Sequence, residues 1–467
     1  MSFPAVVVRT TASVERPAAR VLGRSRAVGS TDSDRLPWWP ALLVCGLAAV
    51  GWSAVALTLH AGLRTGMDLA IFDQAVRSLS HGKAPYSAIK GTNLWGDHFH
   101  PAILLLAPLY CIRDDPRLLL VAQSFLIGFA CAVIARCAQR VLAVDARDRL
   151  ATILGLCLAG SVGVQGAGSF DFHEVALAAV PVALSSAALV ERRYRAAALW
   201  SLAVLPVKED MGLVVLGVCL VLTVRGQWRL AIAPAVLAIG WMAAAVKWVI
   251  PGMAGREWTY GSTLSGDPAA LLPTLAGSLT RTDGIGLTAC ALLLAAGLLA
   301  LRSPVALAAL PILLARGITT GSHLPKLGLH YDLLPQILLF AAALDMLQGF
   351  DDVRARRAIR VMAVATVTLL LVGPMMWRLP VALTGIPRAP QAGRALTEVP
   401  ADAQLAVDPR LASHASPTHP RLQLLEPDRP VQPTVGWVVL DLRAHPEGEP
   451  TGLRRVAQHG DFVVLRR

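Results

Sequence analysis

Charged side chains are scarce in this sequence of 467 residues, of which only 16% are Asp, Glu, Lys or Arg. A soluble domain of ordinary composition carries about 25%. Hydrophobic residues make up 55% of the chain, and the mean hydropathy is +0.55. Apolar runs longer than 18 residues recur between Pro37 and Trp377. A soluble fold is therefore excluded, and we predict an all-α polytopic membrane protein with about 10–11 spans, some broken or re-entrant.

Signatures of several other protein classes are missing. No cysteine follows Trp377, so the C-terminal region contains no disulfide, and the seven cysteines elsewhere lack the spacing of a zinc site. The sequence has no internal repeat and no glycine-rich phosphate loop. The net charge of +12 does not indicate nucleic-acid binding, because the excess arginine lies in short loops and in the N-terminal tail, outside any patch with aromatic residues.

The N-terminus is predicted to lie in the cytoplasm. Residues 1–36 are rich in Arg, Ser and Ala, and we interpret them as a disordered cytoplasmic tail. The apolar run that follows is too long for a signal peptide and lacks a cleavage site, so it is the first span, at about 37–60. The transmembrane domain is predicted at 37–376.

An outer loop at 61–116 follows the first span. Its apolar run Pro101–Cys111 is about 16 Å long as a helix, too short to cross the bilayer, and predicts an interfacial or re-entrant helix. Residues 377–467 are Pro-rich and of ordinary polarity, with β-like runs at 436–442 and 461–466. They predict a small soluble α/β domain on the extracytoplasmic side.

The apolar stretch 196–224 is interrupted by Pro206 and then by three ionisable residues, Lys208-Glu209-Asp210. It either crosses once as a tilted helix, or forms two short helices that turn back at this point. The positive-inside rule favours the second arrangement. With a cytoplasmic N-terminus, the inner segments then hold 14 Arg in 35 residues, and the outer segments hold 10 Lys and Arg in 123. The predicted location is the inner (plasma) membrane.

Polar and ionisable residues gather in separate segments on the predicted outer side. A charged group inside a bilayer costs roughly 2.5–3.5 kcal/mol on insertion scales, so such groups usually face a protein interior or a wet cavity. We therefore predict one shared, water-accessible cavity at the outer leaflet. The candidate site residues are Asp68, Asp73, Gln74, Asp97, His98, His100, Asp171, His173, Glu174, Lys208, Glu209, Asp210, Lys326 and His330.

Structural roles compete with functional ones. Asp68 is also a candidate N-cap of an interfacial helix, and His330 with Tyr331 is a candidate interfacial anchor. The Lys208-Glu209-Asp210 triplet is the strongest functional signal, because a structural turn rarely places three charges inside an apolar stretch.

Metal binding is a further alternative, because Asp and His side chains suit divalent cations as well as proton transfer and phosphate contact. No cofactor is identified, and a divalent cation is one candidate. Its candidate ligands are Asp97, His98, His100 and His173.

Four motifs occur in order along the chain: Asp-Leu-x-Ile-Phe-Asp-Gln at 68–74, Gly-Asp-His-Phe-x-Pro at 96–101, Phe-Asp-Phe-His at 170–173 and Lys-Glu-Asp at 208–210. Together they resemble a bacterial family of predicted membrane proteins known as domain of unknown function 2079. The resemblance runs from about Gly66 to the C-terminus.

That family is in turn similar, more distantly, to the GT-C glycosyltransferases. These enzymes share a long first outer loop with interfacial helices, an acidic residue near its start, and sugar donors linked to a lipid phosphate. The resemblance implies a GT-C-like fold, with Asp68 as the catalytic base and Asp97 as the second candidate. The acidic pair that some GT-C members carry on adjacent residues is here five residues apart, as Asp68 and Asp73.

The leading hypothesis is an inverting glycosyltransferase that moves a sugar from a polyprenyl-phosphate donor, at the membrane lipid, to a cell-envelope glycan, lipid or protein. Asp68 or Asp97 would deprotonate the acceptor hydroxyl, and cations would receive the charge of the leaving phosphate. The candidate cations are Lys208, His98, His100, His173 and Lys326.

Two other hypotheses stay open. A transporter or flippase of a lipid-linked or polar substrate would need polar groups reachable from both sides, and often shows inverted repeats. A non-enzymatic membrane scaffold would use the C-terminal domain to bind partners in the cell envelope, and would tolerate neutral residues at Lys208 and Asp97.

Overall fold

The computed structural model describes residues 36–258, 260, 268–320, 323–425, 431–445 and 448–467. The chain divides into two units, Met1–Pro37 and Trp38–Arg467. The predicted cytoplasmic tail 1–36 lies, except for Leu36, outside the described residues. All elements below belong to the second unit.

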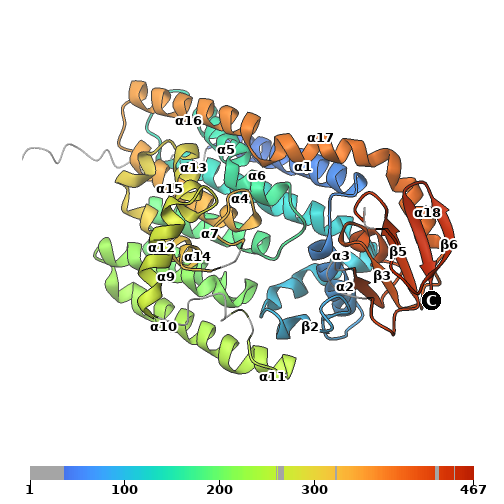
Figure 1. The fold of residues 1–467 in the computed structure, drawn as a ribbon. Helices are drawn as coiled ribbons and strands as arrows, with labels where there is room; N and C mark the ends of the chain where they lie inside the picture. The colour runs from blue at the N-terminus through green and yellow to red at the C-terminus, as the bar shows by residue number, and fades with distance from the viewer. Residues whose placement is uncertain (1–35, 259, 261–267, 321–322, 426–430, 446–447) are drawn as a thin grey trace, which may run out of the picture. The chain divides into compact units, whose positions relative to one another are not determined.

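This unit is mostly helical (Figure 1). Its α-helices are α1 (Trp39–Ala61), α2 (Met67–Ser80), α3 (Ala107–Ile112), α4 (Arg117–Val141), α5 (Arg147–Gly160), α6 (Val162–Gly168), α7 (Val175–Val190), α8 (Tyr194–Leu202), α9 (Gly212–Val224), α10 (Trp228–Ala244), α11 (Ile250–Ala254), α12 (Pro268–Thr280), α13 (Ile285–Ala295), α14 (Leu310–Gly317), α15 (Leu333–Leu347), α16 (Asp352–Val372), α17 (Pro374–Gly385), α18 (Ala389–Thr397) and α19 (Ala412–Ala415). Short 3₁₀ turns that bear on the site are η3 (Pro101–Leu106), η5 (Glu209–Met211) and η10 (His330–Asp332).

Four described helical segments are long and apolar enough to cross a membrane, or five if a bent pair counts as one span. The four are Trp39–Ala61, Arg117–Val141, Trp228–Ala254 and Asp352–Thr397, and the pair is α5 with α6, bent by 55°. Five further apolar helices have only 10–17 residues. The predicted all-α membrane architecture is thus confirmed, while the number of spans stays a prediction.

The helices differ in what they face. α4 is central, because 61% of its apolar window is buried and it packs against α1, α5 and α7. α10 has 22% of its window buried and exposes Ile232, Val236 and Leu237. An apolar helix with an exposed apolar surface is suited to contact lipid.

The interrupted stretch 196–224 consists of α8 and α9, which contact each other and both contact α10. Lys208, Glu209 and Asp210 lie in the connection between the two helices. Contact between consecutive helices is what the turned-back arrangement requires. The run Pro101–Cys111 forms η3 followed by α3, as a short helical segment.

The C-terminal region contains a five-stranded sheet in the order β4-β3-β5-β7-β6. The strands are β3 (Leu405–Val407), β4 (Leu422–Leu424), β5 (Trp437–Asp441), β6 (Arg454–His459) and β7 (Phe462–Arg466). β3 pairs in parallel with β4 and β5, and β7 is antiparallel to β5 and β6. The two predicted β-like runs are β5 and β7, which pair directly, and the predicted C-terminal domain is confirmed as a small sheet domain.

This sheet shares a hydrophobic core with the segment that leads into α2. Leu63 and Ala70 belong to the same buried cluster as Leu405, Val439 and Phe462, and α19 packs against α2. A separate short hairpin, β1 (Tyr86–Ser87) with β2 (Thr92–Asn93), follows α2. The C-terminal domain therefore supports the helix that carries Asp68.

A polar cluster strengthens this junction. His414 of α19 stacks on His60 at the end of α1, with ring centroids 4.2 Å apart and planes at 9°. The His414 Nε2 donates to the His60 carbonyl oxygen at 3.1 Å. The Thr65 hydroxyl lies 2.8 Å from His60 Nδ1 and 2.9 Å from the Ser413 hydroxyl.

Acidification is expected to weaken the junction. Burial lowers the pKa of His414 from 6.5 to about 4, so the unfolded state binds this proton more readily than the folded state. The stability that neutral His414 contributes is present above pH 6.5 and is lost as the pH falls from 6.5 toward 4. Thermal unfolding of the purified protein across this range measures the loss, and His414→Gln should reduce it. Equal pH dependence in both proteins would contradict the prediction.

Candidate functional site

The first turn of α2 is held by a residue from a distant loop. Asp171, between α6 and α7, accepts hydrogen bonds from the backbone N–H groups of Gly66 at 2.9 Å and Leu69 at 3.2 Å. Burial, with the nearby Asp68 charge, raises the pKa of Asp171 to about 7, although these N–H groups favour the carboxylate. Gly66 is the N-cap residue of α2. Asp171 therefore does the capping that the sequence offered as an alternative role for Asp68.

The Asp68 carboxylate faces a histidine instead. Its Oδ2 lies 3.7 Å from His173 Nε2, and the two side chains are 29% and 10% exposed. Among the described residues, Asp68 has no other ion pair and its carboxylate makes no hydrogen bond. This carboxylate is partly open to solvent and available to a substrate.

Four histidine and phenylalanine rings connect the segments around Asp68. His173 stacks on His330 with centroids 3.4 Å apart, and Phe72 lies 5.8 Å from His173 and 5.6 Å from His100. His100 and His330 are 1% and 3% exposed, yet neither ring nitrogen of either residue has a partner in the described part of the chain. Buried polar atoms without partners are rare and mark places where water or a ligand binds.

Two buried ionic contacts join the remaining motifs. Lys208 Nζ lies 3.0 Å from Glu174 Oε1, and their side chains are 10% and 2% exposed. Glu209 holds the outer loop, because its Oε1 lies 2.5 Å from His98 Nδ1 and its Oε2 accepts from the Phe99 N–H at 3.0 Å. Motifs more than 100 residues apart in sequence are thereby brought into direct contact.

Asp97 sits at the edge of this cluster and is already engaged. Lys90 Nζ lies 2.9 Å from its Oδ2, and the Tyr260 hydroxyl donates to its Oδ1 at 3.1 Å. Burial opposes ionisation, but neighbouring His98 and Lys90 hold the pKa of Asp97 below its usual value. Both oxygens are occupied, so Asp97 is less suited than Asp68 to accept a proton.

Three candidate residues do not contact this cluster. Asp73 is fully buried and binds Arg77 at 2.8 Å and the Tyr110 hydroxyl at 2.7 Å. Gln74 Oε1 accepts from the Ser87 hydroxyl and the Ala88 N–H, which fixes the loop after α2. Lys326 is at the surface, 42% exposed, with its Nζ 3.7 Å from Asp283. Asp210 lies beside Lys208 in sequence, and its buried Oδ1 has no partner in the described residues.

No group of three or more His, Cys, Asp or Glu in the described part of the chain is arranged to hold a metal ion. The four candidate ligands do not form one group, and three of them have other partners. Asp97 binds Lys90, His98 binds Glu209, and His173 faces Asp68.

Sequence reasoning missed two arginines that shape the site. Arg316 pairs with Asp332 at 2.7 Å and donates to the Leu324 and Tyr331 carbonyls, which fixes the segment carrying His330. Arg378 of α17 donates to the carbonyls of Ser169 and Gly328. Both arginines lie at the ends of apolar runs. An arginine in such a position usually pairs with other polar groups, so the sequence itself could have indicated these two residues.

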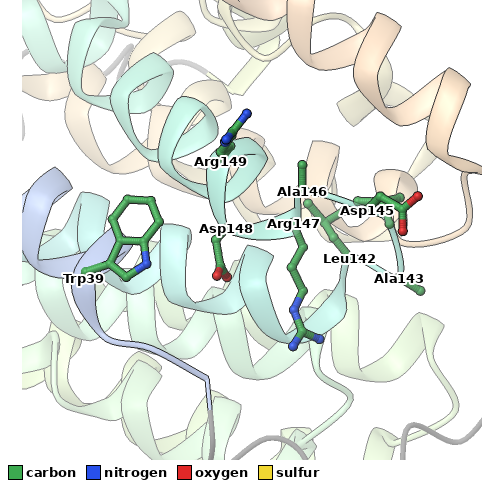
Figure 2. Close-up of a pocket in the computed structure, with 9 residues that line it drawn as sticks. Trp39, Leu142, Ala143, Asp145, Ala146, Arg147, Asp148 and Arg149 are labelled. Carbon is green, nitrogen blue, oxygen red and sulfur yellow. The ribbon is translucent and has the colours of Figure 1, made fainter.

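Two cavities lie outside this cluster. The larger, about 530 Å³, is lined by Trp39 and residues 142–149 at the connection between α4 and α5. Figure 2 shows Arg147 and Asp148 extending to one side of this loop and Arg149 to the other. It contains none of the candidate residues. The smaller cavity, about 230 Å³, is an apolar groove between α1, α5 and α17.

The fold of the described residues is GT-C-like. The chain aligns with a crystal structure of ArnT from Cupriavidus metallidurans in the apo state with a TM-score of 0.53, covering 91% of this chain and 97% of that one at 14% identity. ArnT is a GT-C glycosyltransferase, so the predicted GT-C-like fold is confirmed.

The chain belongs to the family described as "Predicted membrane protein (DUF2079)", whose model matches residues 59–459. The family suggested by the four motifs is thereby confirmed. No curated protein matches the sequence.

Proposed function

We propose that this protein is an inverting GT-C-type glycosyltransferase that transfers a sugar from a polyprenyl-phosphate donor to an extracytoplasmic acceptor of the cell envelope. The observation that carries the proposal is the set of contacts that links the four motifs, within a fold shared with ArnT. Asp68 faces His173, Lys208 pairs with Glu174, and Glu209 binds His98. The fold alone indicates a lipid-linked donor only by analogy. The arrangement of charges around Asp68 gives the proposal its chemical content.

Asp68 is the proposed base. Its carboxylate removes the proton of the acceptor hydroxyl as the acceptor oxygen attacks the anomeric carbon. The bond between the anomeric carbon and the phosphate oxygen breaks, and its electron pair leaves with the polyprenyl phosphate. His173, 3.7 Å from Asp68, lies close enough to share the transferred proton or to stabilise developing charge.

Lys208 is the proposed electrostatic partner of the leaving phosphate. It is buried and is held by Glu174, the residue next to His173 in sequence. A fixed charge that does not reorganise during the reaction is the arrangement that stabilises a developing anion. His98 contacts Glu209, the residue next to Lys208 in sequence.

Transfer and transport are separable by experiment. The purified protein in nanodiscs is incubated with cell-envelope glycans and lipids as acceptors and with a panel of polyprenyl monophosphates that carry radiolabelled pentoses or hexoses. Movement of the label from the polyprenyl phosphate to an acceptor is followed. Turnover is expected for at least one donor. If no donor turns over, but the same lipids exchange between the leaflets of proteoliposomes, the protein is a flippase and the proposal fails.

A further inference from the structure

Arg378 and Met375 occupy the same face of α17, because residues three apart on a helix are neighbours. Met375 lines the apolar groove between α17, α1 and α5. From α1 and α5 the groove is lined by Leu47, Gly51, Trp52, Val55 and Leu156. Figure 1 shows α17 running along α1 beside α6, in agreement with the contacts between these helices.

Among the described residues, the Arg378 guanidinium makes no ion pair with a carboxylate, although the charge of Asp171 acts on it. In the described part of the chain it binds only neutral oxygens, namely the Ser169 carbonyl and hydroxyl at 3.1 and 2.9 Å and the Gly328 carbonyl at 2.9 Å. The other partly buried cations near the site are each paired with an acid. These pairs are Lys90 with Asp97, Lys208 with Glu174, and Arg316 with Asp332.

Arg378 also connects the groove to the cluster around Asp68. Its guanidinium lies 5.5 Å from the centre of the Phe170 ring, and that ring lies 5.5 Å from His173 and 5.3 Å from His330. A chain of side-chain contacts therefore leads from α17, through the Arg378 guanidinium and the Phe170 ring, to the histidine that faces Asp68. An apolar groove with a guanidinium on the same helix face matches a long isoprenoid chain with a terminal phosphate.

We propose that this groove and Arg378 form the binding site of the isoprenyl phosphate, with the first isoprene units in the groove and a phosphate oxygen on the guanidinium. This inference rests on the proposed function for the identity of the lipid. It adds a location and a residue that the four motifs do not contain.

Binding of C55 isoprenyl phosphate to the full-length protein in detergent tests the proposal without requiring transfer. Gly51→Leu places a side chain in the groove, and no atom lies within 4 Å of the added Cβ. Its matched control is Gly46→Leu, on the same helix and equally open but outside the groove. Arg378→Gln removes the cation, and Arg281→Gln removes one that is 56% exposed and paired with Asp283.

Arg378→Gln is expected to weaken binding of C55 isoprenyl phosphate about tenfold or more, since a hydrogen bond to a charged group is worth at least that factor. Gly51→Leu is expected to weaken binding about tenfold or more as well, because the leucine occupies the groove. The two controls should bind like the wild type. Unchanged binding by Gly51→Leu overturns the proposal even if Arg378→Gln misfolds. So does displacement of the isoprenyl phosphate by an equal concentration of phosphatidylglycerol, which would mark a general lipid contact.

The two proposals fail in different ways. Specific binding that depends on Gly51 and Arg378, without turnover of any donor, would support the proposed lipid site and contradict the proposed glycosyltransferase function. Turnover that neither variant affects would support the proposed glycosyltransferase function and contradict the proposed lipid site.

Discussion

Asp68→Asn is expected to reduce sugar transfer by about 10²–10⁴-fold, the usual contribution of a general base. Asparagine keeps the size of the side chain but cannot take the proton of the acceptor hydroxyl. The variant should fold normally, because α2 is capped by Asp171 and the Asp68 carboxylate makes no hydrogen bond among the described residues. Initial rates with the donor identified for the wild type measure the effect, and the melting temperature verifies folding.

Asp283→Asn is the matched control for this variant. Asp283 is on the predicted outer side, 49% exposed, and pairs with Arg281 and Lys326. Its loss should leave transfer within about twofold of the wild type, because exposed ion pairs contribute little. Full activity of Asp68→Asn would remove Asp68 as the base. If Asp97→Asn alone abolished transfer without loss of stability, the base would have to be reassigned to Asp97.

The sequence predicted the convergence of the motifs because the cost of burying charge is a general rule. Lys208, Glu209 and Asp210 inside an apolar stretch had to meet other polar groups, and the structure supplies Glu174 and His98. Which acid would meet which base was beyond the sequence. Partners such as Lys208 and Glu174 lie in separate connections between helices, and only packing sets their distance.

Helical geometry explains why Asp73 does not lie beside Asp68 at His173. Asp73 is five residues after Asp68, which rotates it by about 140° around α2 at 100° per residue. It therefore points away from His173, toward Arg77 and Tyr110. Once a helix is assigned to 67–80, this rotation can be calculated. The motif at 68–74 thus serves both the candidate site and the packing of the outer loop.

Some details of the fold could not be predicted, because the local sequence pattern is weak at those positions. The bend between α5 and α6 occurs at Gly160-Ser161 inside a continuous apolar run, without a proline to mark it. The strands β3 and β4 have three residues each, too few for a readable alternation. α12 begins at Pro268 and contains Pro273, which interrupts its apolar residues and weakens the helical pattern.

Lys208→Met is expected to destabilise the protein by about 3–5 kcal/mol, the usual cost of leaving one member of a buried ion pair without its partner. Glu174 is 2% exposed and has Lys208 as its cationic partner at 3.0 Å. Reversible unfolding in mixed detergent measures the loss. Lys326→Met is the control, since Lys326 is 42% exposed and its contact with Asp283 is 3.7 Å long. Its expected effect is within about 1 kcal/mol.

The double variant Lys208→Met with Glu174→Gln distinguishes a structural pair from a catalytic one. Removing both charges together eliminates the uncompensated carboxylate, so most of the lost stability should return. Transfer should not return, because the leaving phosphate would still lack its fixed cation. A double variant that is stable and fully active would make Lys208 and Glu174 purely structural. One that is stable and inactive would assign Lys208 to the reaction, independently of any effect on folding.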